Sequence, residues 1–238
     1  MKKIFLFLFV CIIVNVAKAQ NDVVVDPNAE VRTLNGTFNS IRVAGGIDLY
    51  LSQSDNEAVA VSASEEHLRN AIKTTVVNGT LMIYFTGEKL WTPRNRKLKA
   101  YVSFKNIDKL EASGACDVMV AGTIAGPTLH LNLSGASDFK GDVKVNELQM
   151  DLSGASDVKI SGTAISVNIE SSGASDVKGF DLASDSCTAK ASGASDINIT
   201  VNKELNAHAS GASDIYFKGN GAIKDMHSSG SSSVSRKS

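Results

Sequence analysis

The chain has 238 residues, of which 43% are hydrophobic, 21% are charged and only 6% are aromatic. Its 24 Lys+Arg nearly balance its 25 Asp+Glu, which excludes a disordered polyelectrolyte and leaves no basic excess for nucleic acid. With 19 Gly, 3 Pro and one Trp, the composition also excludes a collagen-like repeat and a multispanning membrane protein, and the core must use small side chains.

The first residues have the pattern of a signal peptide. Lys2 and Lys3 precede an apolar run over 4–14, and Ala17-Lys18-Ala19 supplies the small residues that signal peptidase recognises. The run is too short for a helix that crosses a bilayer of about 30 Å. We therefore expect a cleaved signal peptide over 1–19, a mature chain without a transmembrane span, and a periplasmic, outer-surface or secreted location.

The part that follows predicts a leader and a β-rich cap. We expect a flexible leader over 20–37. Residues 38–104 contain several stretches typical of strands, and Asn78-Gly79 predicts a type I′ hairpin between the strands at 72–77 and 81–85. This half of the chain is expected to cap the remainder.

A repeated pentapeptide dominates residues 105–235. The unit reads Ser-Gly-Ala-Ser-Asp, with Cys116 in place of the second serine in the first copy, and its glycines recur every 18–21 residues. Six copies are clear and a seventh is degraded: Ser113–Asp117, Ser134–Asp138, Ser153–Asp157, Ser172–Asp176, Ser192–Asp196, Ser210–Asp214 and Ser229–Ser233. So regular a period indicates stacked repeats, each of which buries its surface against its neighbours.

Apolar and polar residues alternate on both sides of each glycine, which is the pattern of strands. The positions two, four and six residues before a glycine are mostly apolar or small, as in Leu133, Leu131 and Leu129. A leucine-rich repeat, the main alternative at this period, needs a Leu/Asn consensus that the sequence lacks. We therefore predict an all-β fold, a β-helix-like solenoid of about seven rungs roughly 4.8 Å apart, with the N-terminal β-rich part as its cap.

The repeat geometry also bears on the cysteines that remain after export. Cys116 and Cys187 lie several rungs apart, far beyond the ~7 Å Cα separation that a disulfide allows. We expect both to be unpaired, and Cys187 to be a small buried hydrophobe in a column of Leu and Val.

The aspartates that end the repeats should form an outward column, which is the first candidate ligand-facing surface. Its members are Asp117, Asp138, Asp157, Asp176, Asp196 and Asp214. Stacked carboxylates suit calcium, whereas Asp and Ser in bends commonly accept hydrogen bonds from main-chain amides. We favour the structural role, because the glycine-rich calcium nonapeptide is absent from the sequence.

A loop around Trp91, with Arg94 and Arg96, is the second candidate ligand-facing surface, for an anionic glycan or a lipid head group. The alternative, which we favour for this loop, is a solvated basic segment without a ligand. The sequence predicts no catalytic residues, cofactor or metal site. The Ser-containing units lack the second glycine of a nucleophile elbow, and the four histidines have no metal-ligand spacing.

The chain resembles the putative auto-transporter adhesin, head GIN domain family of bacterial envelope proteins. Four features carry the resemblance: the exported leader, the Phe38-x-x-Ile41-x-Val43 opening, the Asn78-Gly79-x-Leu81-x-Ile83 segment and the serial pentapeptides. The resemblance covers nearly the whole mature chain from about Phe38. It implies a β-solenoid, a cell-envelope location and an adhesive role, and it implies no catalytic residues.

These observations lead to one main hypothesis and two alternatives. The main one is an exported, non-enzymatic adhesin or binding module that presents a repetitive polar face to an envelope protein or surface glycan, with no nucleic-acid partner. The first alternative is a structural envelope component that assembles with itself as a homo-oligomer. The second is a β-helix enzyme that cleaves polysaccharides.

Overall fold

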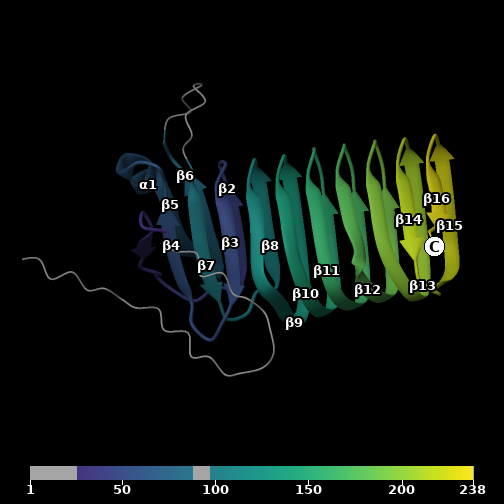
Figure 1. Cartoon of the computed structure of the whole chain (residues 1–238), viewed down its shortest axis with the longest axis horizontal. Coiled ribbons are helices and arrows are strands. Elements are labelled where there is room, and N and C mark those ends of the chain that lie inside the picture. The colour runs from purple at the N-terminus through teal and green to yellow at the C-terminus, as the bar shows by residue number, and fades with distance from the viewer. Residues whose placement is uncertain (1–25, 88–96, 238) are drawn as a thin grey trace, which may run out of the picture.

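The computed structural model describes residues 26–87 and 97–237. Its sixteen strands form one continuous sheet that winds along the long axis of the molecule as a β-solenoid (Figure 1). The elements are β1 Glu30–Arg32, β2 Ser40–Ala44, β3 Asp48–Gln53, β4 Ala58–Ser62, α1 Glu66–Ala71, β5 Ile72–Val77, β6 Thr80–Phe85, β7 Lys99–Phe104, β8 Lys109–Gly114, β9 Asp117–Gly135, β10 Asp138–Leu152, β11 Asp157–Ser171, β12 Asp176–Ala191, β13 Asp196–Gly211, β14 Asp214–Lys218, β15 Ala222–Gly230 and β16 Ser233–Arg236. The predicted all-β solenoid is confirmed.

Each long strand runs from the aspartate of one pentapeptide, around a return bend, to the next pentapeptide. Neighbouring strands pair in parallel, and equivalent repeat positions lie side by side: Phe139 beside Val158, and Leu148 beside Val167. Longer units are accommodated by local shifts of register, as between Lys140 and Asp142. The sequence period therefore corresponds to one rung of the solenoid.

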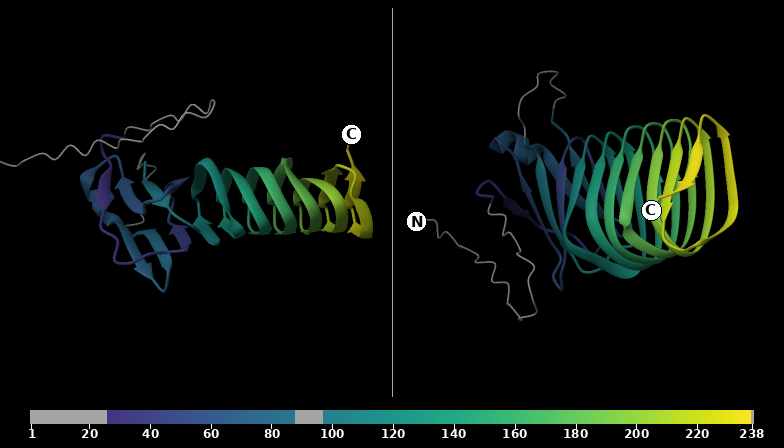
Figure 2. Two further views of the ribbon diagram at one scale, coloured as in Figure 1. Left: turned by 90° about the horizontal axis from the view of Figure 1, so that it is seen from below. Right: turned by 45° about the vertical axis from the view of Figure 1, so that its right-hand side comes forward.

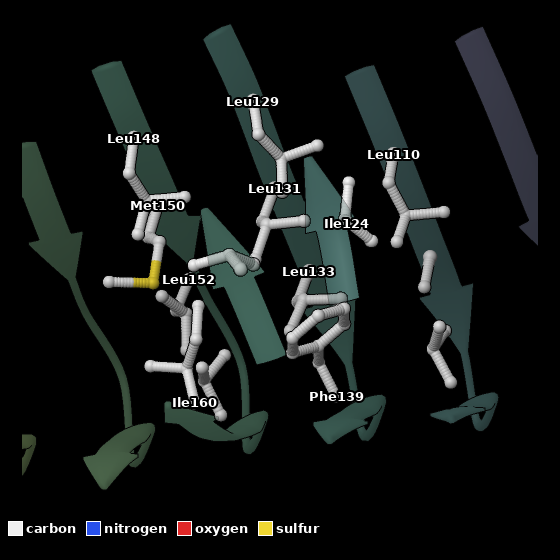
Figure 3. Close-up of a cluster of buried hydrophobic side chains, with 14 of the residues drawn as sticks. Leu110, Ile124, Leu129, Leu131, Leu133, Phe139, Leu148, Met150, Leu152 and Ile160 are labelled. Carbon is white, nitrogen blue, oxygen red and sulfur yellow. The ribbon is translucent and has the colours of Figure 1, made fainter. Parts of the chain in front are cut away.

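The alternating apolar residues fill the interior in columns that run across the rungs. Leu129, Leu131 and Leu133 lie beside Leu148, Met150 and Leu152 of the next rung, and all six are buried (Figure 3). Burial of such side chains stabilises the fold by roughly 25 cal/mol per Å² of apolar surface. Towards the C-terminus the same columns narrow to buried alanines at 189, 191, 207 and 209.

The two cysteines occupy the interior as expected. Both are free and buried, and Cys187 lies in the column between Val167 and Leu205. Burial raises the pKa of the Cys187 thiol to about 12, so this cysteine packs as an apolar side chain.

The N-terminal half builds the first rungs and closes that end of the stack (Figure 2). Strands β2 and β3 form a rung that pairs with β8 and β9 on one side and with β6 and β7 on the other. Beyond it, β4 and β5 add antiparallel strands to β7 and β6. Asn78 and Gly79 both have positive φ, 49° and 74°, which confirms the predicted tight hairpin.

Part of the stretch expected to be a flexible leader is ordered. Strand β1 pairs antiparallel with β4, and Arg69 of α1 holds Glu30 with 2.9 Å between Nε and Oε2. Main-chain pairing and this ion pair attach residues 30–32 to the cap. The expected signal peptide over 1–19 and residues 20–25 lie outside the described residues. Within the described ranges, no helix has the length and apolar character needed to cross a membrane.

Candidate functional site

Each repeat turns through a bend, the Ser-Gly bend, in which the pentapeptide glycine has positive φ. Gly154 has φ of 83°, and a Cβ added there would lie 2.4 Å from the carbonyl oxygen of Gly135 in the preceding rung. The same Gly135 oxygen accepts a hydrogen bond from the N–H of Ala155 at 2.7 Å. Both the left-handed backbone and the close approach of successive bends require glycine.

In five units the second serine points into the bend and is completely buried: Ser137, Ser156, Ser175, Ser195 and Ser213. Ser156 Oγ donates to the carbonyl of Ser153 at 3.1 Å and accepts from the N–H of Ser137 at 3.4 Å. Cys116 takes this position in the first unit, with its Sγ 3.3 Å from the carbonyl oxygen of Ser113. These serines satisfy main-chain groups within and between rungs, which is a structural role.

The aspartate column lies on the outside, as predicted, and its carboxylates are used by the fold. Asp138 Oδ1 accepts from the N–H of Asp157 at 3.2 Å, and Asp176 Oδ1 accepts from the N–H of Asp196 at 3.3 Å. At the end of the column, the Asp214 carboxylate accepts hydrogen bonds from the hydroxyl and the N–H of Ser233. These two hydrogen bonds, together with one from the Tyr216 hydroxyl, lower the pKa of the Asp214 carboxyl. These contacts are the ones expected from the structural interpretation.

A lysine two residues after one of the aspartates reduces the repulsion within the column. Lys178 Nζ lies 2.9 Å from Asp157 Oδ2, and this hydrogen bond raises the pKa of the lysine. In the part of the chain that the structure describes, no group of three or more His, Cys, Asp and Glu side chains is placed to hold a metal ion.

A groove runs along another surface of the rungs. We call this surface face A, and it is formed by the strand segments that precede the Ser-Gly bends. The aspartate column lies on face B, which is formed by the strand segments that follow the bends. The groove has a volume of about 820 Å³. Six strands, β9 to β13 and β15, each contribute one side chain from the position three residues before the glycine: Asn132, Asp151, Glu170, Lys190, His208 and His227.

Ion pairs and hydrogen bonds between rungs order the polar side chains of face A. Asp151 Oδ2 lies 2.6 Å from His130 Nε2, and Lys190 Nζ lies 2.8 Å from Glu170 Oε1. His208 Nε2 lies 3.2 Å from Asp225 Oδ2. The groove therefore offers carboxylate, imidazole, amide and ammonium groups in a fixed order, spaced by the separation between rungs of about 4.8 Å.

The groove could not be located from the repeated residues, because its lining residues are not part of the repeat. The repeated Gly, Ser and Asp support the bends, whereas the position three residues before each glycine changes from rung to rung. An outward position that stays polar but does not repeat is the signal that could have located the groove. The other candidates from the sequence, Trp91, Arg94 and Arg96, lie outside the described residues.

The comparisons with known proteins agree with this architecture. The model of the putative auto-transporter adhesin, head GIN domain family matches residues 37–221, and the chain belongs to this family. A search of the curated proteins found no match.

Solved structures share the fold at low sequence identity. A putative adhesin from Bacteroides fragilis NCTC 9343 has a TM-score of 0.82 at 19% identity, covering 88% of this chain and 96% of the other. A putative lipid binding protein from Parabacteroides distasonis ATCC 8503 has a TM-score of 0.65 at 20% identity, with 90% and 98% covered. A putative adhesin from Parabacteroides merdae ATCC 43184 has a TM-score of 0.62 at 19% identity, again with 90% and 98% covered. At these identities the similarity concerns the fold.

Proposed function

We propose that the protein is an exported, non-enzymatic adhesin of the bacterial cell envelope, and that it binds an extended surface glycan along the groove of face A. One observation carries this proposal: six strands from successive rungs each place a polar side chain at the same position of the groove. A ligand that itself repeats can contact successive rungs in the same way, and a polysaccharide is such a ligand.

The chemistry of the groove supports a polymer rich in hydroxyl groups. Asp151 and Glu170 offer carboxylate oxygens that accept hydrogen bonds from sugar hydroxyls, whereas Lys190 and His208 offer donors for sugar oxygens or carboxylates. Asn132 contributes an amide that can both donate and accept. Many weak contacts along a chain add up to useful affinity when they act together.

The same contacts favour recognition over cleavage of the polymer. A glycosidase needs two carboxyl groups that act on one bond, one as an acid and one as a base or nucleophile. In the groove, Asp151 is engaged by His130 and Gln149, and Glu170 is engaged by Lys190. The polysaccharide-cleaving alternative therefore has less support from the geometry than adhesion.

Glycan-array binding by the exported protein tests the proposal. Lys190→Glu should weaken binding at least tenfold, because it removes a donor and places a second negative charge beside Glu170. Lys159→Glu is the matched control, since it makes the same change at an exposed lysine on face B. Lys190→Gln replaces the first variant if circular dichroism shows altered folding. No retained glycan, or equal loss in the face A and face B variants, would contradict the proposed function.

A further inference from the structure

Among the described residues, none covers the last rung at the C-terminal end of the solenoid. All nine residues of β15 are exposed. Ile223 and Met226, which continue the interior columns of Leu205 and Ala207, are 44% and 52% exposed. Within residues 26–87 and 97–237, β15 pairs with β13 alone and β16 with β14 alone. Two apolar side chains and a row of unpaired main-chain groups therefore face outward, and such an edge readily pairs with another strand.

The opposite end of the stack has a different structure. There the parallel rungs are followed by antiparallel strands β1 and β5 and by helix α1, at the far end of the molecule from β15 and β16 (Figure 1). The C-terminal end of one copy therefore cannot pair with the N-terminal end of another copy in the way that successive rungs pair. A second copy therefore fits the C-terminal end best by presenting its own C-terminal end, which gives a closed twofold contact rather than a filament.

The direction of the amides in β15 follows from the preceding rungs. The N–H of Ser153, the residue directly before the motif glycine Gly154, donates to the Leu133 carbonyl at 3.0 Å. A residue at this position therefore directs its main-chain N–H and C=O groups to the preceding rung. In a parallel strand this direction alternates along the chain. Since the motif glycine of β15 is Gly230, the main-chain groups of Met226 and Ser228 are directed to the open end.

We propose that two copies of the chain associate through this end, with β15 of one copy antiparallel to β15 of the other about a twofold axis at Met226. Met226 then faces the partner's Met226 in a pair that exchanges two main-chain hydrogen bonds. Asp225 faces the partner's His227 in the adjacent pair without main-chain hydrogen bonds, where side chains approach most closely. The symmetry generates this acid–imidazole pair twice, and Lys224 faces the partner's Ser228, so like charges do not oppose each other along β15.

This arrangement has a consequence for ligand binding that rests on the proposed function. The twofold axis of an antiparallel strand pair is perpendicular to the sheet, so face A of both copies lies on the same side. The groove that ends at His227 in one copy then continues into the groove of the partner. The dimer would present one groove of doubled length, and a polymer that spans both halves would dissociate more slowly.

Sedimentation-equilibrium ultracentrifugation of the exported protein tests the dimer without any glycan, so it separates failure of the dimer from failure of the proposed function. His227→Glu places two carboxylates opposite each other at both symmetric pairs, and Asp225→Lys removes the acceptor that faces the imidazole at both. Each change should weaken dimerisation about tenfold. The double variant Asp225→Lys/His227→Glu restores opposite charges and should return the dimer. Asp181→Lys, an exposed acid-to-base change in β12, is the control and should leave the dimer intact.

Met226→Pro provides a second test that does not depend on charge. It removes an N–H that the single chain does not use, and proline is tolerated on an edge strand, so the chain should fold and remain a monomer. The proposal is overturned if the unaltered protein stays monomeric at high micromolar concentration or forms filaments. It is also overturned if Met226→Pro dimerises normally or if the charge-exchanged double variant does not recover.

Discussion

The carboxylate of Asp138 and the main-chain N–H of Asp157 are joined across neighbouring rungs, with 3.2 Å between Oδ1 and N. The same link joins Asp196 to Asp214. Asp138, Asp176, Asp196 and Asp214 each accept the N–H that starts the strand of the following rung. These carboxylates therefore support the stack in the way that main-chain hydrogen bonds do.

Removal of one carboxylate should destabilise the stack modestly. Asp138→Ala leaves the N–H of Asp157 without its side-chain acceptor and should lower the free energy of unfolding by about 1 kcal/mol, whereas Asp138→Asn keeps an acceptor oxygen and should lose less. Urea denaturation measures both. Calcium should leave the unfolding midpoint unchanged; a midpoint that rises with calcium in the unaltered protein but not in Asp138→Asn would support the calcium ladder instead.

Alanine substitutions at three glycines distinguish the cost of backbone strain from the cost of steric overlap. Gly154→Ala combines positive φ with a 2.4 Å contact and should destabilise by about 3 kcal/mol or more, while Gly122→Ala has positive φ in open space and should lose about 1 kcal/mol. Gly126→Ala has neither feature and should change little. Thermal and urea unfolding give the order; equal losses at Gly154 and Gly122 would show that the close approach of the bends is unimportant.

The buried serines should tolerate cysteine better than alanine. Ser156→Ala leaves the Ser137 N–H and the Ser153 carbonyl without their partner and should lower the free energy of unfolding by about 1–3 kcal/mol. Ser156→Cys should lose less, because Cys116 already occupies the equivalent position. Ser153→Ala removes an exposed hydroxyl in the same bend and serves as the control. A Cys variant less stable than the Ala variant would contradict this role.

Asp48 gives the cap a specific pH dependence. Burial and the nearby Asp117 raise the pKa of the Asp48 carboxyl above its value in the unfolded chain, so its ionised form opposes folding. Asp48→Asn should therefore raise the free energy of unfolding at pH 7 by a few tenths of a kcal/mol, since the side chain is partly solvated. The gain should vanish near pH 3, where the carboxyl is protonated in both states. Urea denaturation at the two pH values tests this, and an equal gain at both would exclude titration as the cause.

Most of the fold could be predicted from the sequence because its determinants are local and repeated. The apolar alternation around residues such as Leu131 and Met150 specifies the strands, and Asn78-Gly79 specifies the hairpin. The pairing of β1 with β4 could not be predicted, since three residues held by a distant strand and by Arg69 carry no local pattern. The groove of face A was missed for a related reason: Lys190 and His208 become neighbours only once the rungs are stacked.

Arg42 forms an ion pair with Glu111 although 69 residues separate them, because the chain leaves the stack after β3, builds the cap, and returns at β8 beside β2. The two ends of the molecule should therefore respond differently to mechanical force. When force is applied at the C-terminus, the rungs can detach from the solenoid one after another. Pulled from the N-terminus, the rung of β2 and β3 is held between neighbours on both sides and must break both contacts together. In the adhesive role that we propose, the direction in which load reaches the stack would decide how long an attachment lasts.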